Sequence, residues 1–504
     1  MIVQLHLDAG PVRRWHLRTI ERIASLPGVT LRVSRADRGP ATSLPDTLFR
    51  LEKIVYGVPE GHPAEVVDDV SLPVPDGSAV PPDVVIDITG RWPAGDVPVV
   101  RLCCNDAPPD VGAVDAVLAG VVPVLTLDLA VDGTQKRIAG WRVAVEEPDV
   151  AVRGVGTVFG RAVQLLVQAA ADLAAGADLR HARAYVTDLG PGDPARRPAP
   201  ASFAAGMFAQ RVAAKIRQHL RLAPRWSTGL RRLPAGTDGR LPQLCGATFD
   251  RLPDDGLRFY ADPFLWRRDG RDFLFVEEFP FATERGVLSV AEVGADGRPS
   301  RPRVVLEADC HLSFPFLLEH EGVVYLVPES ARRRAVELWR AVSFPDRWER
   351  AAVLVDDVDV VDATVVRRAD GWYLLASPRQ EWTSSWDALA IWTAPHLEGP
   401  WQPVPGNPVM VDVASARPAG TPFAWGERLV RPVQDCVGRY GAGLGFAVVD
   451  RLDAGGFAQT VVGALRPARP LSGLHTYNRS SGLETVDVFG PRDGGRFTVQ
   501  ERDG

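Results

Sequence analysis

Two patterns of apolar and polar positions divide this chain near residue 225. Before that point, short apolar runs bounded by Pro and Gly alternate with segments of helical period. The runs at 2–8, 29–33, 84–89 and 97–102 are typical of buried parallel strands, and 12–27 and 157–175 are spaced as helices. Alternating strands and helices predict an open α/β sheet for a first domain, residues 1–185.

The segment 186–224 connects this domain to the rest. Its first part, 186–205, is rich in Pro, Gly and Ala and predicts a linker. A basic amphipathic helix is expected at about 202–221, with Arg211 and Lys215 on it. Such a helix either binds an anionic ligand or a membrane surface, or simply connects two domains in solvent.

From residue 225 the chain changes to short strands broken by Gly, Asp and Pro, and a repeat becomes visible. Each unit is an apolar strand, a Gly turn and a second strand, as in YADPFLW (260–266) followed by FLFVEE (273–278). Equivalent positions recur roughly every 50–58 residues, with a looser fourth unit and a weak fifth. They are Asp262, Phe314, Asp362, Arg417 and His475.

Further strands follow each hairpin, which gives about four strands per unit, the size of a propeller blade. A single blade cannot bury both faces of its sheet, so neighbouring blades stack around an axis. Residues 225–504 therefore predict an all-β, five-bladed propeller, and the segment 226–252 is a candidate for the strand that closes the ring.

Composition restricts the function. The net charge is −6, so no overall field favours nucleic acid. No apolar run reaches the roughly 18–20 residues of a membrane span. The five cysteines are scattered and the nine histidines show no zinc-binding spacing. We expect a cytoplasmic protein without a metal or cofactor.

In a propeller the first strand of every blade lines the central channel. Side chains on these strands are therefore the candidates for catalysis. Carboxylates stand at two of these positions, Asp262 and Asp362, and Glu329 ends the second strand of blade two. Cleavage or transfer of a glycosyl bond needs such a set of acids. The alternative is structural, because Asp before Pro is also ordinary turn chemistry.

Further residues are candidates for substrate binding around the same channel. Each of them has a structural alternative, such as an ion pair between blades or a satisfied core histidine. They are Glu278, His311, Ser313, Arg379, Arg417, Gln434, Asp435 and His475.

The series YADPFLW…FLFVEE, HLSFPFLLEHEGVVYLVPES, VDATVVRRADGWYLLASP and LHTYN resembles the N-terminal propeller of plant glucosamine inositolphosphorylceramide transferases and their bacterial relatives. It is more distantly similar to the five-bladed arabinanase, levansucrase and invertase superfamily. The latter resemblance implies that Asp262 is a base or nucleophile. His311 and Ser313 stand where those hydrolases place a second Asp, and Asp362 where they place the Glu acid.

Bacterial relatives of this kind resemble fusions of the propeller to a formyltransferase-like domain, with which residues 1–185 are compatible. Folate-dependent formyl transfer implies an Asn, a His and an Asp around one pocket. Asn105 is present, but no histidine follows it before His181. The resemblance therefore implies an inactive module.

These observations predict a carbohydrate-active protein of glycan biosynthesis that transfers a glycosyl group from a sugar or nucleotide-sugar substrate at the propeller channel. Two alternatives stay open: a glycoside hydrolase of the same superfamily, and a propeller that binds a glycan or partner without catalysis. The sequence leaves the oligomeric state open.

Overall fold

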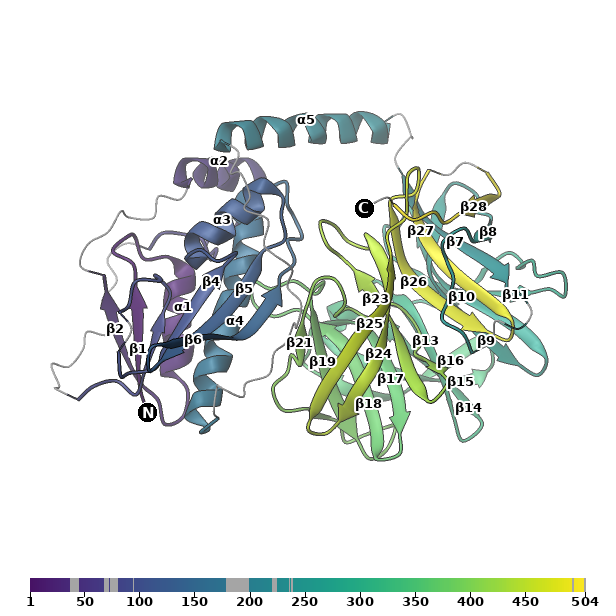
Figure 1. The fold of residues 1–504 in the computed structure, drawn as a ribbon. Coiled ribbons are helices and arrows are strands. Elements are labelled where there is room, and N and C mark those ends of the chain that lie inside the picture. The colour runs from purple at the N-terminus through teal and green to yellow at the C-terminus, as the bar shows by residue number, and fades with distance from the viewer. Residues whose placement is uncertain are drawn as a thin grey trace. The chain divides into compact units, whose positions relative to one another are not determined.

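A computed structural model describes residues 1–36, 45–67, 72, 80–93, 95–177, 199–219, 224–234, 236, 239–491 and 494–502. The chain divides into two compact units (Figure 1). Unit 1 comprises Met1–Ala213 with Gln380–Ser384, and unit 2 comprises Ala214–Arg379 with Ser385–Gly504. Most of the predicted linker, together with His181, lies outside the described residues.

Unit 1 contains one six-stranded sheet in the order β2-β1-β3-β4-β5-β6. Four strands are parallel, as the apolar runs predict, and all but the edge strand β2 are largely buried: β1 (Ile2–Leu7), β2 (Thr30–Arg35), β3 (Val84–Asp87) and β4 (Val99–Cys104). Two antiparallel strands complete it, β5 (Val124–Val131) and β6 (Thr134–Arg142). The sheet is therefore mixed.

Helix α4 (Ala151–Ala174) is the long helix that the sequence predicts, and it begins six residues before the expected start. It packs against the helices α1 (Arg14–Ala24), α2 (Asp46–Tyr56) and α3 (Pro109–Ala119). Trp15 of α1 stacks on Phe159 of α4 with ring centroids 5.1 Å apart. The basic helix is α5 (Pro200–His219), close to the predicted 202–221.

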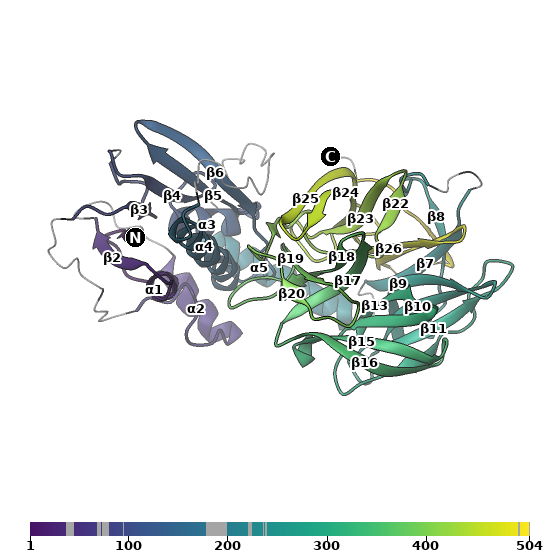
Figure 2. The same cartoon turned by 90° about the horizontal axis from the view of Figure 1, so that it is seen from below.

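Unit 2 is a five-bladed propeller, which confirms the fold predicted from the repeat (Figures 1 and 2). In Figure 2 the inner strands β9, β13, β17 and β26 lie around the middle of the ring. Blade one is formed by β9 (Arg258–Arg268), β10 (Arg271–Pro280), β11 (Val287–Val293) and β12 (Arg303–Leu306). Blade two is formed by β13 (Ser313–His320), β14 (Val323–Glu329), β15 (Ala335–Ser343) and β16 (Arg347–Asp356).

The next two blades repeat this arrangement. Blade three contains β17 (Val360–Arg368), β18 (Gly371–Pro378), β19 (Ala388–Ala394) and β20 (Gln402–Pro403), with β21 (Met410–Val411) paired to β19. Blade four contains β22 (Phe423–Trp425), β23 (Arg428–Asp435), β24 (Gly443–Asp453) and β25 (Gly456–Leu465).

Blade five joins the two ends of the propeller. Strands β26 (Gly473–Ser480) and β27 (Leu483–Gly490) form its hairpin, and β7 (Arg225–Arg232) pairs with β27 from Arg225 to Arg232. β8 (Thr248–Arg251) and β28 (Arg496–Thr498) complete the sheet. The predicted closing segment 226–252 therefore does close the ring.

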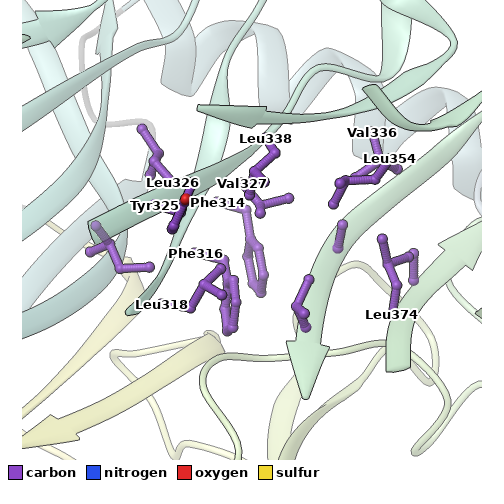
Figure 3. Packing of buried hydrophobic residues seen from close by; sticks show 14 of the residues in the cluster. Phe314, Phe316, Leu318, Tyr325, Leu326, Val327, Val336, Leu338, Leu354 and Leu374 are labelled. Carbon is purple, nitrogen blue, oxygen red and sulfur yellow. The ribbon is translucent and has the colours of Figure 1, made fainter. Parts of the chain in front are cut away.

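Apolar side chains fill the space between the blades. One cluster contains Phe314 and Phe316 of blade two together with Leu374 of blade three (Figure 3). Alternating residues of the inner hairpins supply these contacts, so the period-2 pattern of the sequence becomes the inter-blade core.

Candidate functional site

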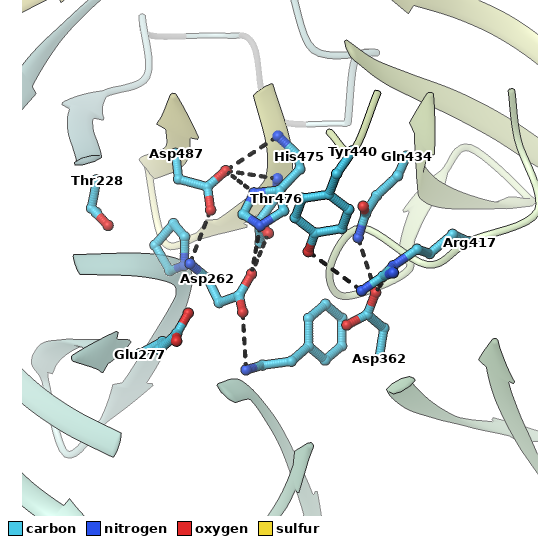
Figure 4. A network of polar contacts seen from close by, with 12 residues as sticks. Thr228, Asp262, Glu277, Asp362, Arg417, Gln434, Tyr440, His475, Thr476 and Asp487 are labelled. Carbon is cyan, nitrogen blue, oxygen red and sulfur yellow. Dashed lines mark hydrogen bonds and ion pairs between the residues drawn. The ribbon is translucent and has the colours of Figure 1, made fainter. Parts of the chain in front are cut away.

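A β-bulge lies in the inner strand of four blades, at the positions of the sequence repeat. In blade one, Asp262 and Pro263 lie opposite the single residue Val276, and 314–315, 362–363 and 475–476 are bulged in the same way. Bulges redirect a side chain without breaking the sheet. Here they bring side chains from blades far apart in sequence to one place (Figure 4).

Asp262 is the centre of one half of this site. Its carboxylate is 6% exposed and accepts hydrogen bonds from the Thr476 hydroxyl (2.8 Å) and the Phe314 amide (3.2 Å). Burial raises the pKa of Asp262 to about 7, although the charge of His475 opposes the rise. A carboxyl group with this pKa exchanges its proton near neutral pH.

His475 lies between two carboxylates. Its Nε2 is 3.5 Å from Asp262 Oδ1 and its Nδ1 is 2.7 Å from Asp487 Oδ1. Burial alone would lower the pKa of His475, but the charge of Asp487, and then that of Asp262, raises it to about 9. The imidazole is therefore cationic at neutral pH, and its ring stacks on Trp226 at a centroid distance of 3.9 Å.

Asp362 is the centre of the other half, which blade four supports. Arg417 Nε donates to Asp362 Oδ2 at 2.5 Å, and the Gln434 amide donates to the same oxygen at 2.9 Å. Arg417 also donates to the Tyr440 hydroxyl at 3.3 Å. The Asp362 carboxylate is therefore fixed in place by two donors from blade four.

Glu329 has the opposite environment. It ends β14, paired with Ser313 at the edge of the blade-two bulge. Burial, and then the negative charge of Asp362, raises the pKa of Glu329 well above its ordinary value. The two neighbouring carboxyl groups thus differ in environment: Asp362 accepts hydrogen bonds from Arg417 and Gln434, whereas burial beside Asp362 favours the protonated form of Glu329.

Three half-buried aromatic side chains border the same residues. Tyr440 faces His475 edge-on at 5.2 Å, and the Trp386 ring is 5.8 Å from Tyr440. Trp226 is 6.2 Å from Tyr440 on the side of His475. Rings of this kind bind the apolar face of a sugar and also order neighbouring side chains.

Some predicted binding residues have partners within a blade. Glu278 forms an ion pair with Arg258 and accepts from Ser289 at 2.7 Å. Asp435 forms a two-bonded ion pair with Arg466, at 2.6 and 2.8 Å. Asp435 therefore forms an ion pair, as the structural alternative predicts, but within its blade and not between blades.

The other predicted residues lie at the start of blade two and the end of β18. His311 contacts Glu277 at 3.2 Å, and Ser313 is buried beside Glu329. Glu277 in turn lies next to Asp262 (Figure 4). Arg379 is exposed, with its guanidinium 3.4 Å from the Ser385 hydroxyl.

The residues around Asp262 are also candidates for a metal site. Asp262, His475 and Asp487 offer three possible ligand atoms within 4.8 Å of one another. The carboxylates already accept hydrogen bonds from Thr476 and from backbone amides, and a cationic imidazole repels a metal ion. These residues fit an internal ion-pair network better than a metal ion.

Sequence reasoning missed Trp226, Tyr440, Thr476 and Asp487. Their positions in the site depend on ring closure and on a loop of blade four, which the repeat does not describe. Asp487 did carry a signal. It occupies the place opposite the bulge where the other blades have Val276, Pro328 and Ala376, so a charge stands where the repeat is apolar.

Comparison with known proteins places these features in context. Residues 248–481 match the family model of the N-terminal part of glucosamine inositolphosphorylceramide transferase 1. The enzyme of that name from Oryza sativa subsp. japonica is 32% identical over 198 residues, which are 38% of this chain and 26% of the rice protein. Its Arabidopsis thaliana counterpart is 32% identical over 187 residues, 36% of this chain and 24% of that protein.

Solved structures with similarity are five-bladed glycoside hydrolases at low identity. The GH43_1 enzyme of Xanthomonas citri, solved with xylose, is 14% identical with a TM-score of 0.34, over 48% of this chain and 91% of that one. CoXyl43, a β-xylosidase/α-arabinofuranosidase from a compost metagenome, is 13% identical with a TM-score of 0.36, over 49% and 96%. The chain spans about a quarter of the length of the plant relatives, and its propeller is similar to their N-terminal part.

Proposed function

We propose that the propeller channel transfers glycosyl groups in glycan biosynthesis, with Glu329 as the acid and Asp262 as the base. One observation carries the proposal: Arg417 and Gln434 hydrogen-bond to the Asp362 carboxylate, while the neighbouring Glu329 has a raised pKa. Pairs of carboxyl groups in different protonation states are typical of sites that make or break glycosyl bonds.

The reaction would proceed in one balanced exchange. Glu329 gives its proton to the leaving oxygen as the bond between that oxygen and the anomeric carbon breaks. The oxygen of an acceptor hydroxyl forms the new bond to the anomeric carbon, and its proton passes to Asp262. Asp362 supplies negative charge beside the developing oxocarbenium ion.

Charge favours a glycoside over a nucleotide sugar as the donor in the channel. Five carboxyl groups converge there, from Asp262, Glu277, Glu329, Asp362 and Asp487, against the cations Arg417 and His475. A diphosphate would be repelled by those of the five groups that are ionised, whereas the protonated acid Glu329 does not contribute. It also leaves without needing a proton, whereas a sugar oxygen needs the acid that Glu329 provides. The names of the plant relatives support a sugar-containing substrate.

The test replaces Glu329 with Gln and measures transfer from aryl glycosides and nucleotide sugars to oligosaccharide acceptors. Loss of the acid should slow turnover by about 10²–10⁴-fold for a poor leaving group and much less for dinitrophenol. Glu319→Gln is the matched control, because Glu319 is exposed at the other end of the same hairpin. Equal slowing for good and poor leaving groups would contradict the role of Glu329.

Two other functions have distinct outcomes in the same assays. Release of nitrophenol from aryl glycosides without an acceptor would identify a hydrolase, with water in place of the acceptor. Both Asp262 and Asp362 are hydrogen-bonded within the protein, which favours a binding propeller as the third candidate. Sugar binding without turnover by any donor would identify that function.

We propose that unit 1 is a formyltransferase-like module without formyl transfer activity. The Asn105 amide group accepts a hydrogen bond from the Val124 amide at 2.9 Å and donates to the Val122 carbonyl at 3.3 Å, so it links the end of β4 to the segment that enters β5. Free, scattered cysteines support a reducing compartment, the cytoplasm, as the site of action. Turnover of a formyl-folate by the protein would refute the first proposal, and a disulfide in the native protein the second.

A further inference from the structure

Asp487 connects blades one and five through a single carboxylate. Oδ1 accepts the backbone amides of His475 (3.2 Å) and Thr476 (2.9 Å), the two bulge residues of blade five. Oδ2 accepts the backbone amide of Asp262, the first bulge residue of blade one, at 2.9 Å. The side chain of Asp487 is fully buried, and its one carboxylate is hydrogen-bonded to both bulges (Figure 4).

The same carboxylate orients an imidazole. Asp487 Oδ1 is 2.7 Å from His475 Nδ1, and the opposite ring nitrogen is 3.5 Å from Asp262 Oδ1. Trp226 stacks on the ring at an interplanar angle of 21° and fixes its plane. Asp487, His475 and Asp262 therefore form a chain in which each member sets the position of the next.

The bulge itself does not require this carboxylate. Blades one, two and three form the same bulge with Val276, Pro328 and Ala376 at the equivalent place. A buried carboxylate is costly unless it is fully hydrogen-bonded. Its presence in blade five alone, beside Asp262, points to a role in the site.

We propose that Asp487 is a positioning residue: through His475 and the two bulges it holds the Asp262 carboxylate in one orientation toward the channel. The inference rests on the proposed function in taking Asp262 as the reacting carboxylate. The groups that face His475 are Asp262 of β9, Asp487 of β27, Trp226 of β7, Tyr440 before β24 and, through its charge, Asp362 of β17.

The experiment compares full-length Asp487→Asn with wild type by ¹⁵N NMR of the histidine side chains, with His475 assigned from His475→Gln. Wild-type His475 should be an imidazolium at neutral pH and should titrate near pH 9. In Asp487→Asn the midpoint should move by more than one pH unit toward the ordinary value. The pH profile of turnover should shift with it, and kcat should fall about tenfold more than KM changes.

Glu484→Gln is the matched control. Glu484 is on the same strand, is equally buried and accepts a hydrogen bond from Tyr477 at 3.0 Å, but lies on the other face. It should affect stability without moving the His475 titration or the pH profile. If Asp487→Asn does not fold, Asp262→Asn keeps the test decisive: His475 should stay cationic because Asp487 is still in place.

The outcomes separate the inference from the function. A wild-type His475 that titrates near 6.5, or an unchanged titration in Asp487→Asn, would overturn the positioning role while transfer activity persists. A His475 that loses its charge in Asp262→Asn would overturn it too. The expected NMR shifts with no turnover of any glycoside would refute the proposed function and leave the link from Asp487 to Asp262 standing.

Discussion

Left-handed backbone recurs at the same residue of three blades. Asp262, Phe314 and Asp362 have φ values of 46°, 43° and 56°, although none is glycine. Asp tolerates this conformation, whereas for Phe it is a rare outlier. The burial of the Phe314 ring and the hydrogen bond from its amide to Asp262 offset the strain. Strain of this kind gathers where a side chain must be held at a functional site.

The raised pKa of His475 makes the free energy of unfolding depend on pH. Its folded-state pKa of about 9 lies above the ordinary 6.5. The folded state holds the proton more tightly, so this contribution, about 3 kcal/mol, is fully present below pH 6.5 and is lost as pH rises through 9. Asp262, whose pKa is raised to about 7, loses its own contribution as the pH rises through 7, so the further loss at higher pH belongs to His475.

Calorimetry between pH 7 and 10 measures this loss. Wild type should lose stability steeply, and His475→Gln should start less stable and lose less over the same interval. Parallel curves for the two proteins would show that His475 is not charged in the folded state.

Bulged hairpins bring the residues of the sequence repeat together in the candidate site. Each one places its bulge residue, and the residue one step beyond on the second strand, at the same end of the blade. Glu277, Glu329 and Ser377 pair with the residue before the bulge in blades one to three. The bulged hairpin therefore sets the position of each of these side chains. The residues that surround the side chain differ from blade to blade.

Gly229 in strand β7 packs tightly against two aromatic side chains. A Cβ added at Gly229 would come within 2.3 Å of Phe497 and 2.8 Å of Phe249, so Gly229→Ala should cost about 1–3 kcal/mol by displacing these side chains of β28 and β8. Gly463→Ala in β25 is the control, since nothing lies within 4 Å of that Cβ. Denaturant unfolding compares them, and equal midpoints would contradict the tight packing of β7.

For the whole molecule, ring closure joins the first and last strands of the propeller. β27 pairs with β7 along its whole length, from Leu483 to Gly490. Without β7 the edge of β27 would expose unpaired amides and carbonyls, and Trp226 would be lost from behind His475. None of the helices in the described ranges is long and apolar enough to cross a membrane.

Two fragments of the chain test whether the propeller needs its closing strand. A fragment of residues 224–502 should fold with sharp near-ultraviolet circular dichroism and cooperative unfolding. A fragment of residues 252–502, which lacks β7 and β8, should lose both and aggregate. Equally cooperative unfolding of the shorter fragment would show that the ring does not depend on its closing strand.

The propeller and the repeat positions on its inner strands follow from the sequence alone, because hairpin signals and alternating apolar positions are local. Asp262, Glu329 and Asp362 stood out for the same reason. The sequence also contains a signal for the hairpin of β5 and β6, the Asp-Gly pair at 132–133. These two residues form its turn with positive φ. That signal was missed, so the mixed character of the first sheet was not expected.

The chemistry of those residues depends on the tertiary structure. Arg417 reaches the Asp362 carboxylate from the next blade, and the pKa of Glu329 is raised because Glu329 is buried beside Asp362. Asp487 acquires its role because ring closure brings blade five against blade one. Charge states depend on burial and on partners distant in sequence, and neither is written in the local pattern.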